Sequence, residues 1–293
     1  MSLFKKFAAT TLALTMVFSL AACGGSSDTA TTEEGGDAAT TGKVYKIGTD
    51  TTFAPFEFQN DAGEFVGIDI DLLNAIAEDQ GFEVELQSLG FNAAVQALEA
   101  GQVDGVIAGM SITPERQEKF DFSDPYFDSG VVMGVKEDNE DIKSYEDLAG
   151  KKVAVKIGTE GQTFAESIKD EYGFTTVVFD DSNSMYLDVK SGNSVACFED
   201  YPVMGYAISQ GSGLKMVTEK EQGSSYGFAV NKGENAELLE MFNAGLANLK
   251  ESGKYDEILN TYIQELSYAE GFLFRKKIFC ILVGSSALWV RFL

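Results

Sequence analysis

Residues 103–116 read VDGVIAGMSITPER, and two structural signals meet within them. The apolar run at the start, which ends at Gly109, is typical of a short buried strand. Thr113 is a favoured helix N-cap and Pro114 a favoured first helical residue, so a helix is expected to begin there. A buried strand that leads into a helix is a basic unit of α/β folds.

The preceding sequence shows the same alternation of short β-rich runs with amphipathic helical runs. It predicts strands at 44–49 and 82–87 and helices at 69–79 and 92–100. Together with a strand at 103–108, this is a β-α-β-α-β order, the plan of a parallel sheet covered by helices.

The alternation then restarts. Strands are predicted at 131–135, 152–156, 175–179, 194–198 and 214–217, and helices at 162–171, 185–190 and 202–210. A strand at 226–230 and helices at 236–251 and 255–262 follow. Two α/β units and a terminal return indicate two lobes joined by two crossings. Ligands of open α/β sheets bind beyond the carboxyl ends of strands, where this chain has Asp50, Gly109, Lys156 and Asp200.

The first turn of the helix after Thr113 carries Arg116, the single arginine among residues 1–274. A cation at a helix N-terminus opposes the helix dipole, so an anionic partner is expected. The planar guanidinium donates two parallel hydrogen bonds to a carboxylate, which favours a ligand carboxylate as that partner. The alternative is a structural ion pair with Glu115, Asp121 or Asp124.

The composition excludes several function classes. The chain has 46 acidic and 22 basic residues and a formal net charge of −24, which repels polyanions, so no nucleic-acid partner is expected. It contains no histidine, and histidine is the usual general base and the commonest metal ligand. Because nucleotide-binding glycine motifs are also missing, we expect no enzyme activity, no metal site and no cofactor.

The N-terminus has the order of an export signal, with two lysines, an apolar stretch and small residues before Cys23. This order resembles the bacterial lipobox, which implies a lipoprotein signal at 1–22 and a lipid on Cys23; a plain secretory signal is the alternative. Residues 23–43 predict a flexible tether. The basic, apolar tail at 271–293 is interpreted as a membrane contact, the opening of a fused permease or a sequence error.

Six segments of the body occur in a familiar order: GTDTTFAPFEF (48–58), GIDIDL (67–72), AGMSITPER (108–116), DFSDPY (121–126), VKIGT (155–159) and FEDYP (198–202). Together they resemble the polar amino-acid-binding proteins of ABC importers, most closely the glutamine-binding type. The resemblance covers about 44–263. It implies a two-lobed periplasmic-binding-protein-like clamp of type II, with lobe 1 at 44–130 plus 225–265 and lobe 2 at 131–224.

The resemblance also implies a role for each matched residue. Arg116 would grip the ligand α-carboxylate with help from Ser111 and the Thr159 backbone. Asp200 would hold the α-ammonium together with the Gly109 carbonyl and Ser111. The rings of Phe53 and Phe91 would enclose the aliphatic part of the ligand.

Charge pairing supports this assignment independently, because a zwitterion removed from water needs a cation at one end and an anion at the other. Alternatives remain at each position. Phe53 and Phe91 could be ordinary core residues, and Asp200 could cap the helix that starts near Pro202.

Side-chain selection is expected to depend on Asp50 and Lys156. Together they suit a neutral amide, which offers a donor and an acceptor, so glutamine is the predicted ligand. The alternative is an Asp50–Lys156 ion pair that closes the lobes without contacting the ligand. Glu199 stands where the glutamine-binding type carries a histidine, and this departure bears on which amino acid is bound.

The expected function is therefore capture of an L-amino acid at the outer face of the cytoplasmic membrane and delivery to ABC permease subunits by a lipid-anchored monomer. Two other functions are compatible with the pattern. One is a secreted dehydratase of the arogenate or prephenate type, with Glu57 or Glu199 as general acid. The other is an amino-acid sensor module.

Overall fold

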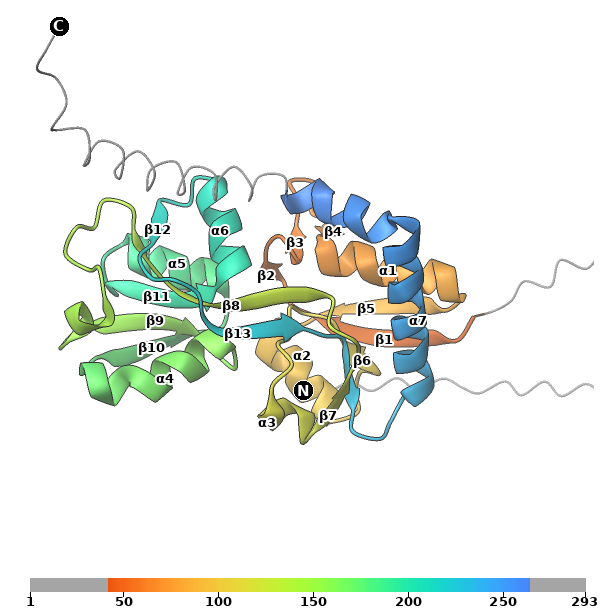
Figure 1. The fold of residues 1–293 in the computed structure, drawn as a ribbon. Coiled ribbons are helices and arrows are strands. Elements are labelled where there is room, and N and C mark those ends of the chain that lie inside the picture. Colours follow the sequence, from red (N-terminus) through yellow and green to blue (C-terminus); the bar gives the residue numbers. More distant parts are fainter. Residues whose placement is uncertain (1–41, 264–293) are drawn as a thin grey trace, which may run out of the picture. The chain divides into compact units, whose positions relative to one another are not determined.

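The computed structural model describes residues 42–263. The expected signal at 1–22, Cys23, the tail at 271–293 and nearly all of the tether lie outside the described residues. Two larger sheets organise the chain (Figure 1). Within residues 42–263, no helix combines the length and the apolar character needed to cross a membrane.

The first sheet has the strand order β5-β1-β6-β14-β7. Its strands are β1 (Val44–Thr49), β5 (Glu83–Ser88), β6 (Gly105–Val106), β7 (Phe120–Phe122) and β14 (Ala229–Asn231). β1 is parallel to β5 and β6, whereas β14 is antiparallel to β6 and β7. The sheet is therefore mixed and not parallel throughout, because the returning chain inserts β14 in the opposite direction.

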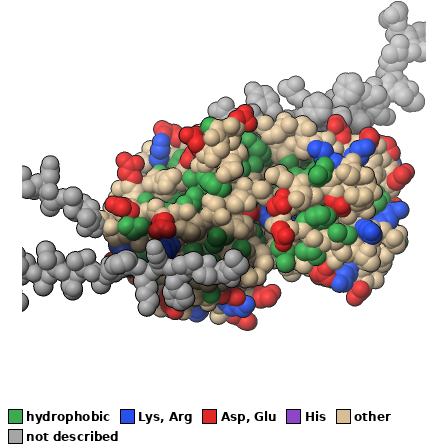
Figure 2. Space-filling view, turned by 180° about the vertical axis from the view of Figure 1, so that it is seen from behind, with side chains coloured by type: hydrophobic (Ala, Val, Ile, Leu, Met, Phe, Trp, Pro, Cys, Tyr) green, Lys and Arg blue, Asp and Glu red, His purple; other side chains and the backbone are tan. Residues whose placement is uncertain are grey.

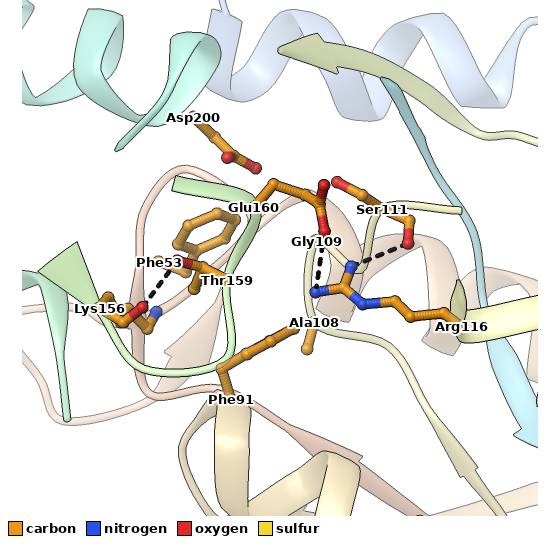
Figure 3. A pocket seen from close by; sticks show the side chains of 10 residues that line it. All are labelled: Phe53, Phe91, Ala108, Gly109, Ser111, Arg116, Lys156, Thr159, Glu160 and Asp200. Atoms are coloured by element: carbon orange, nitrogen blue, oxygen red, sulfur yellow. Dashed lines mark hydrogen bonds and ion pairs between the residues drawn. The ribbon is translucent and has the colours of Figure 1, made fainter. Parts of the chain in front are cut away.

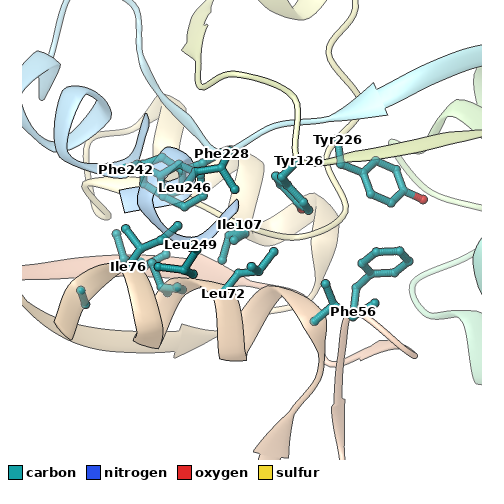
Figure 4. Packing of buried hydrophobic residues seen from close by; sticks show 14 of the residues in the cluster. Phe56, Leu72, Ile76, Ile107, Tyr126, Tyr226, Phe228, Phe242, Leu246 and Leu249 are labelled. Atoms are coloured by element: carbon teal, nitrogen blue, oxygen red, sulfur yellow. The ribbon is translucent and has the colours of Figure 1, made fainter. Parts of the chain in front are cut away.

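Helices cover both faces of this sheet. α1 (Ile68–Gln80) and α7 (Ala236–Ser252) pack against each other, and α2 (Phe91–Glu99) packs on β1 and β6. Figure 4 shows the core beneath α1 and α7, where the rings of Phe228 and Phe242 stack with centroids 4.6 Å apart. Burial of these apolar side chains is the main stabilising contribution to this half of the chain.

The second sheet has the order β10-β9-β11-β8-β12, and β13 also pairs with β8. Its strands are β8 (Phe127–Lys136), β9 (Lys152–Lys156), β10 (Thr175–Phe179), β11 (Ala196–Asp200), β12 (Leu214–Met216) and β13 (Glu221–Tyr226). β9 is parallel to β10 and β11, whereas β8 is antiparallel to β11, β12 and β13.

Alternating side chains divide the second core into two layers. Val131 and Met133 of β8 belong to the cluster that includes Phe164 of α4 (Glu160–Tyr172). Val132 belongs to the opposite cluster, which packs against α5 (Ser182–Lys190) and α6 (Tyr201–Ser209). This is the period of two expected for a strand buried on both faces. A 3-10 helix, η1 (Tyr145–Leu148), precedes β9.

Three short strands follow β1 and form a small antiparallel sheet: β2 (Thr52–Phe53), β3 (Glu57–Gln59) and β4 (Phe65–Val66). The short helix α3 (Pro114–Gln117) begins where the sequence predicts, with Thr113 Oγ1 accepting a hydrogen bond from the Arg116 N–H at 3.2 Å. These connections place Phe53 and Arg116 at the edge of the first sheet.

Several predicted elements need correction. The strand expected at 103–108 is only two residues long in β6; the Ile107 N–H still donates to the Gly48 carbonyl at 3.1 Å, and Gly109 then takes a φ of +53°. The strand expected at 226–230 is divided: β13 ends at Tyr226 in the second sheet and β14 begins at Ala229 in the first. β13 was not predicted as a separate strand, because its sequence, EQGSSY, is polar. The small sheet, β7 and η1 were not predicted.

The remaining predictions agree with the structure to within a few residues. The strands at 152–156 and 175–179 coincide with β9 and β10. The last helix predicted, at 255–262, corresponds to helical residues 254–263. On the face drawn in Figure 2, lysine and arginine side chains lie among acidic ones and form no continuous basic patch.

Candidate functional site

Residues from both sheets line one pocket (Figure 3). The first-sheet side contributes Phe53, Phe91, Ala108, Gly109, Ser111 and Arg116, and the second-sheet side contributes Lys156, Thr159, Glu160 and Asp200. Of the predicted site residues, Asp50 alone is outside this lining. Ala108 and Glu160 are additional. The free space between the side chains is about 10 Å³, close to the volume that one water molecule needs.

Arg116 uses its guanidinium to connect loops of the two sheets. Nη1 donates to the Ser111 carbonyl at 2.8 Å, and Nη2 donates to the Gly158 carbonyl at 3.0 Å. Nη2 also lies 3.5 Å from Glu160 Oε1. The partner is therefore not one of the three acids expected from the local sequence. Burial lowers the pKa of Arg116, and the carboxylates of Glu160 and Asp200 act against that change.

Lys156 and Asp50 form an ion pair in which each side chain is 1% exposed. Lys156 ends β9 and Asp50 directly follows β1, so the pair joins the two sheets at strand ends. The Lys156 ammonium also lies 4.6 Å from the centroid of the Phe53 ring, a cation–π distance. Burial acts to lower the pKa of Lys156, but Asp50 and Glu199 outweigh it, so the pKa is raised and the ammonium stays charged.

Asp200 occupies the N-cap position of α6 but makes no side-chain cap hydrogen bond. Its Oδ2 instead accepts a hydrogen bond from the Tyr226 hydroxyl at 2.5 Å. The capping alternative therefore does not describe this side chain. Burial raises the pKa of Asp200 to about 7, and nearby Glu199 adds to the shift, whereas Tyr226 and Arg116 oppose it. The carboxyl group thus titrates near neutral pH.

The two phenylalanines are both core residues and pocket walls. Phe53 is 4% exposed and belongs to the α1–α7 core, whereas Phe91 is 5% exposed and belongs to the core on the opposite face. Phe53 also requires a glycine opposite it. A Cβ at Gly109 would lie 2.3 Å from the ring, and Gly109 has a φ of +53°, in the left-handed region.

The side-chain hydroxyl groups of Ser111 and Thr159 make hydrogen bonds within the pocket wall. Ser111 Oγ lies 3.2 Å from Ser224 Oγ. Thr159 is the N-cap of α4: its Oγ1 accepts from the Gln162 N–H at 3.3 Å and donates to the Lys156 carbonyl at 2.8 Å. Its hydroxyl is engaged in the cap, which leaves its backbone as the group available to a ligand.

Glu199 points away from the pocket. Its Oε2 accepts hydrogen bonds from Ser182 Oγ at 2.9 Å and from the Tyr186 hydroxyl at 3.0 Å, and its Oε1 accepts from the Asp200 N–H at 3.0 Å. Its influence on the pocket is therefore electrostatic, through Lys156 and Asp200, and not by contact with a ligand.

Two further carboxyl groups, Asp69 and Glu57, are buried close to the pocket; Asp69 was not predicted, whereas Glu57 was considered only as the general acid of a dehydratase. Asp69 is fully buried, and its Oδ2 accepts from the Gly109 N–H and from the Tyr126 hydroxyl, each at 2.8 Å. Burial raises the pKa of Asp69 to about 6. Burial also raises the pKa of fully buried Glu57 well above its usual range, and Asp69 and Asp50 add to the effect.

The sequence contains a feature that could have predicted Glu160 as a residue near the site. Thr159 is an N-cap, and acids are favoured in the first turn that follows a cap. No comparable signal existed for Asp69, because an acid in the first turn of a helix is usually exposed. Among residues 42–263, no cluster of three or more histidine, cysteine or acidic side chains could hold a metal ion.

Comparison with known proteins gives a consistent match. The model of the bacterial extracellular solute-binding proteins, family 3, matches residues 45–265. The arginine-binding extracellular protein ArtP of Bacillus subtilis is 31% identical over 255 residues, which span 87% of this chain and 96% of that protein.

Two solved structures are similar over three quarters of this chain. The second substrate-binding domain of a putative amino acid ABC transporter from Streptococcus pneumoniae is 49% identical, with a TM-score of 0.53, and the match covers 74% of this chain and 99% of the other. An ancestral arginine-binding protein bound to glutamine is 41% identical, with a TM-score of 0.70, covering 75% and 97%. The expected α/β fold of the type II periplasmic-binding-protein-like class is confirmed.

Proposed function

Because this chain belongs to family 3 of the bacterial extracellular solute-binding proteins, we propose that it captures a polar L-amino acid for an ABC importer. The observation that carries the proposal is the pair of opposite charges in one pocket: Arg116 on the first-sheet side and Asp200 on the second. A zwitterion enclosed between them would have both of its charges compensated, which a buried ion requires.

The geometry supports the individual roles. Arg116 and the backbone at Thr159 bind the α-carboxylate, assisted by Ser111. Asp200 and the Gly109 carbonyl bind the α-ammonium. The rings of Phe53 and Phe91 enclose the aliphatic atoms and exclude water, which strengthens the polar contacts.

Glutamine is the proposed ligand. The Asp50–Lys156 pair at the end of β1 and β9 has no net charge, so it favours a neutral side chain over a cationic or an anionic one. An amide offers a donor for Asp50 and an acceptor for Lys156. Related proteins include an arginine-binding protein and an ancestral protein bound to glutamine, and we propose that the choice between such ligands in this chain depends on Asp50 and Lys156.

Binding is proposed to proceed by closure of two lobes. Lobe 1 is assigned to 44–130 plus 225–265 and lobe 2 to 131–224, and the paired strands β8 and β13 carry the chain between the two sheets (Figure 1). The Arg116–Gly158 hydrogen bond and the Lys156–Asp50 ion pair join the two sides across the pocket, so we propose that the two sides separate before a ligand enters. A lipid on Cys23 would hold the monomer at the outer face of the membrane, next to the permease subunits.

The dehydratase alternative receives no support from the site. Glu57 and Glu199, the carboxyl groups considered as its general acid, are both buried and neither lines the pocket. The geometry therefore favours binding without chemistry.

Calorimetry of the purified protein against glutamine, glutamate, arginine, histidine and cystine tests the proposal. We expect one-to-one binding at micromolar or lower concentration, tightest for glutamine. Stronger binding of arginine would overturn the assignment of glutamine alone, whereas no binding of any of the five would overturn the proposed function.

A further inference from the structure

Glu160 lies in the pocket without a role in the scheme above. It is the first residue of α4, directly after the N-cap Thr159. Its Oε1 lies 3.5 Å from Arg116 Nη2, and the two side chains are 16% and 13% exposed. Figure 3 shows the carboxylate directed at the guanidinium from the opposite side of the pocket. The contact joins the first sheet to the second.

The remaining contacts of Arg116 explain why this carboxylate matters. Both hydrogen bonds of its guanidinium go to backbone carbonyls, of Ser111 and Gly158, which carry no formal charge. Over the part of the chain that the structure describes, Glu160 is the one carboxylate within ion-pair distance of Arg116. It therefore supplies the anion that a cation in the first turn of α3 is expected to have.

A ligand carboxylate would need the same place. Arg116 is its proposed partner, and the backbone at Thr159, at the N-terminus of α4, is the second group proposed to bind it. The N-terminus of a helix favours an anion, and the Glu160 carboxylate already lies there. Two carboxylates at one guanidinium would repel each other in a pocket shielded from water.

We propose that Glu160 is an internal competitor for the ligand α-carboxylate, which pairs with Arg116 in the ligand-free protein and is displaced when the amino acid binds. This inference rests on the proposed function. It makes Glu160 a residue that sets affinity: the protein binds its ligand more weakly than the Arg116 and Asp200 contacts alone would allow, and release to the permease is assisted by the return of Glu160.

The properties of the pair suit an exchange. At 3.5 Å the Arg116–Glu160 contact is long for an ion pair, and a ligand carboxylate that replaces Glu160 leaves the shielded Arg116 guanidinium with an anionic partner. Glu160 also has a short path into solvent, because it starts a helix at the edge of the pocket. The alternative is that Glu160 positions Arg116 for the ligand, and the two roles predict opposite effects of removing its charge.

The test is calorimetry of glutamine and of its α-carboxamide with the wild type and with Glu160→Gln. We expect Glu160→Gln to bind glutamine about three- to tenfold more tightly, because a modest ion pair no longer has to be broken. Binding of the α-carboxamide, which lacks the competing carboxylate, should become weaker or stay unchanged. Glu115→Gln is the matched control, since it removes one acidic charge next to Arg116 from an exposed position, and it should leave both affinities within twofold.

Weaker or unchanged glutamine binding by Glu160→Gln would overturn the inference and leave the proposed function intact. An equal gain in glutamine affinity in Glu115→Gln would show that the removal of any negative charge near Arg116 is sufficient, and this result would also overturn the inference. A wild type that binds no amino acid would overturn the proposed function itself. Thermal unfolding of each variant verifies folding, and Glu160→Asp, whose shorter carboxylate reaches Arg116 less well, should show an intermediate gain.

Discussion

The pocket has two ends, and each pairs one cation with one carboxylate in a different way. Asp50 and Lys156 are each 1% exposed and hold each other at the ends of two strands. Arg116 in the short helix α3 and Glu160 at the start of α4 are 13% and 16% exposed and lie 3.5 Å apart. The difference indicates that the first pair stabilises the fold in addition to its proposed role in ligand choice, whereas the second is open to exchange with a ligand.

The energetic reason lies in solvation. A charge deep in a protein cannot regain water when its partner is removed, so the remaining ion is strongly destabilising. At the other end, a ligand carboxylate can take the place of Glu160, so Arg116 keeps an anionic partner when that pair separates. Similar residue types can therefore hold each other at one end of the pocket and exchange partners at the other.

The largest effect is expected at the buried end. Lys156→Met leaves the Asp50 carboxylate buried without its cation, and we expect the free energy of unfolding to fall by about 3–5 kcal/mol. Urea unfolding measures it. Lys136→Met, which breaks the exposed pair with Asp138, is the control and should cost less than about 1 kcal/mol. Restoration of stability in the double variant Asp50→Asn/Lys156→Met would support the mechanism. Equal losses of stability in Lys156→Met and in the control Lys136→Met would contradict it.

The second prediction concerns Asp200, which lies between the two ends. Its pKa of about 7 in the ligand-free protein means that the carboxyl group is protonated in mild acid, whereas binding of an α-ammonium requires the carboxylate. Ligand binding therefore releases a proton below pH 7, and affinity should fall by up to about tenfold per pH unit as the pH decreases. Calorimetry at several pH values, in buffers of different ionisation enthalpy, measures both quantities. Constant affinity from pH 5.5 to 7.5 would be incompatible with an Asp200–ammonium contact.

The ionised form of Asp200 should also lower the free energy of unfolding. Because the folded-state pKa of Asp200 is raised from 3.8 to about 7, its stabilising contribution is full below pH 4 and is lost as the pH rises through 7. Asp200→Asn should therefore increase the free energy of unfolding at pH 8 by about 1–3 kcal/mol, and by little at pH 4. Binding should be lost in the same variant. A gain of equal size at both pH values would show that ionisation is not the cause.

The sequence predicted the position of Arg116 correctly but not the residue that pairs with it. The cap at Thr113 and the proline at 114 placed Arg116 in the first turn of α3, because capping is a local property. The partner of Arg116 is 44 residues away, and the three nearby acids that local reasoning suggested do not reach it. Pairing between the two sheets depends on tertiary structure, which periodicity does not encode.

The secondary structure shows the same contrast between locally encoded features and features that depend on tertiary structure. β9 (KVAVK) and β10 (TTVVF) were predicted with their correct limits, because each is a short run rich in β-branched residues. β13 was missed, and the division of the chain after Tyr226 was not foreseen, because a strand that leaves one sheet for another has no distinct pattern of its own. The alternation of elements indicated two lobes, and the resemblance to a known family supplied their expected bounds.

The most direct test of the central claim is a calorimetric titration of glutamine into the wild type and Arg116→Ala, with Lys119→Ala as the control. Lys119 is an exposed cation three residues away, paired with Glu99 outside the pocket. We predict that Arg116→Ala weakens binding by about 2–5 kcal/mol while Lys119→Ala leaves it unchanged. Unchanged binding in Arg116→Ala would show that the α-carboxylate is held elsewhere and would contradict the account.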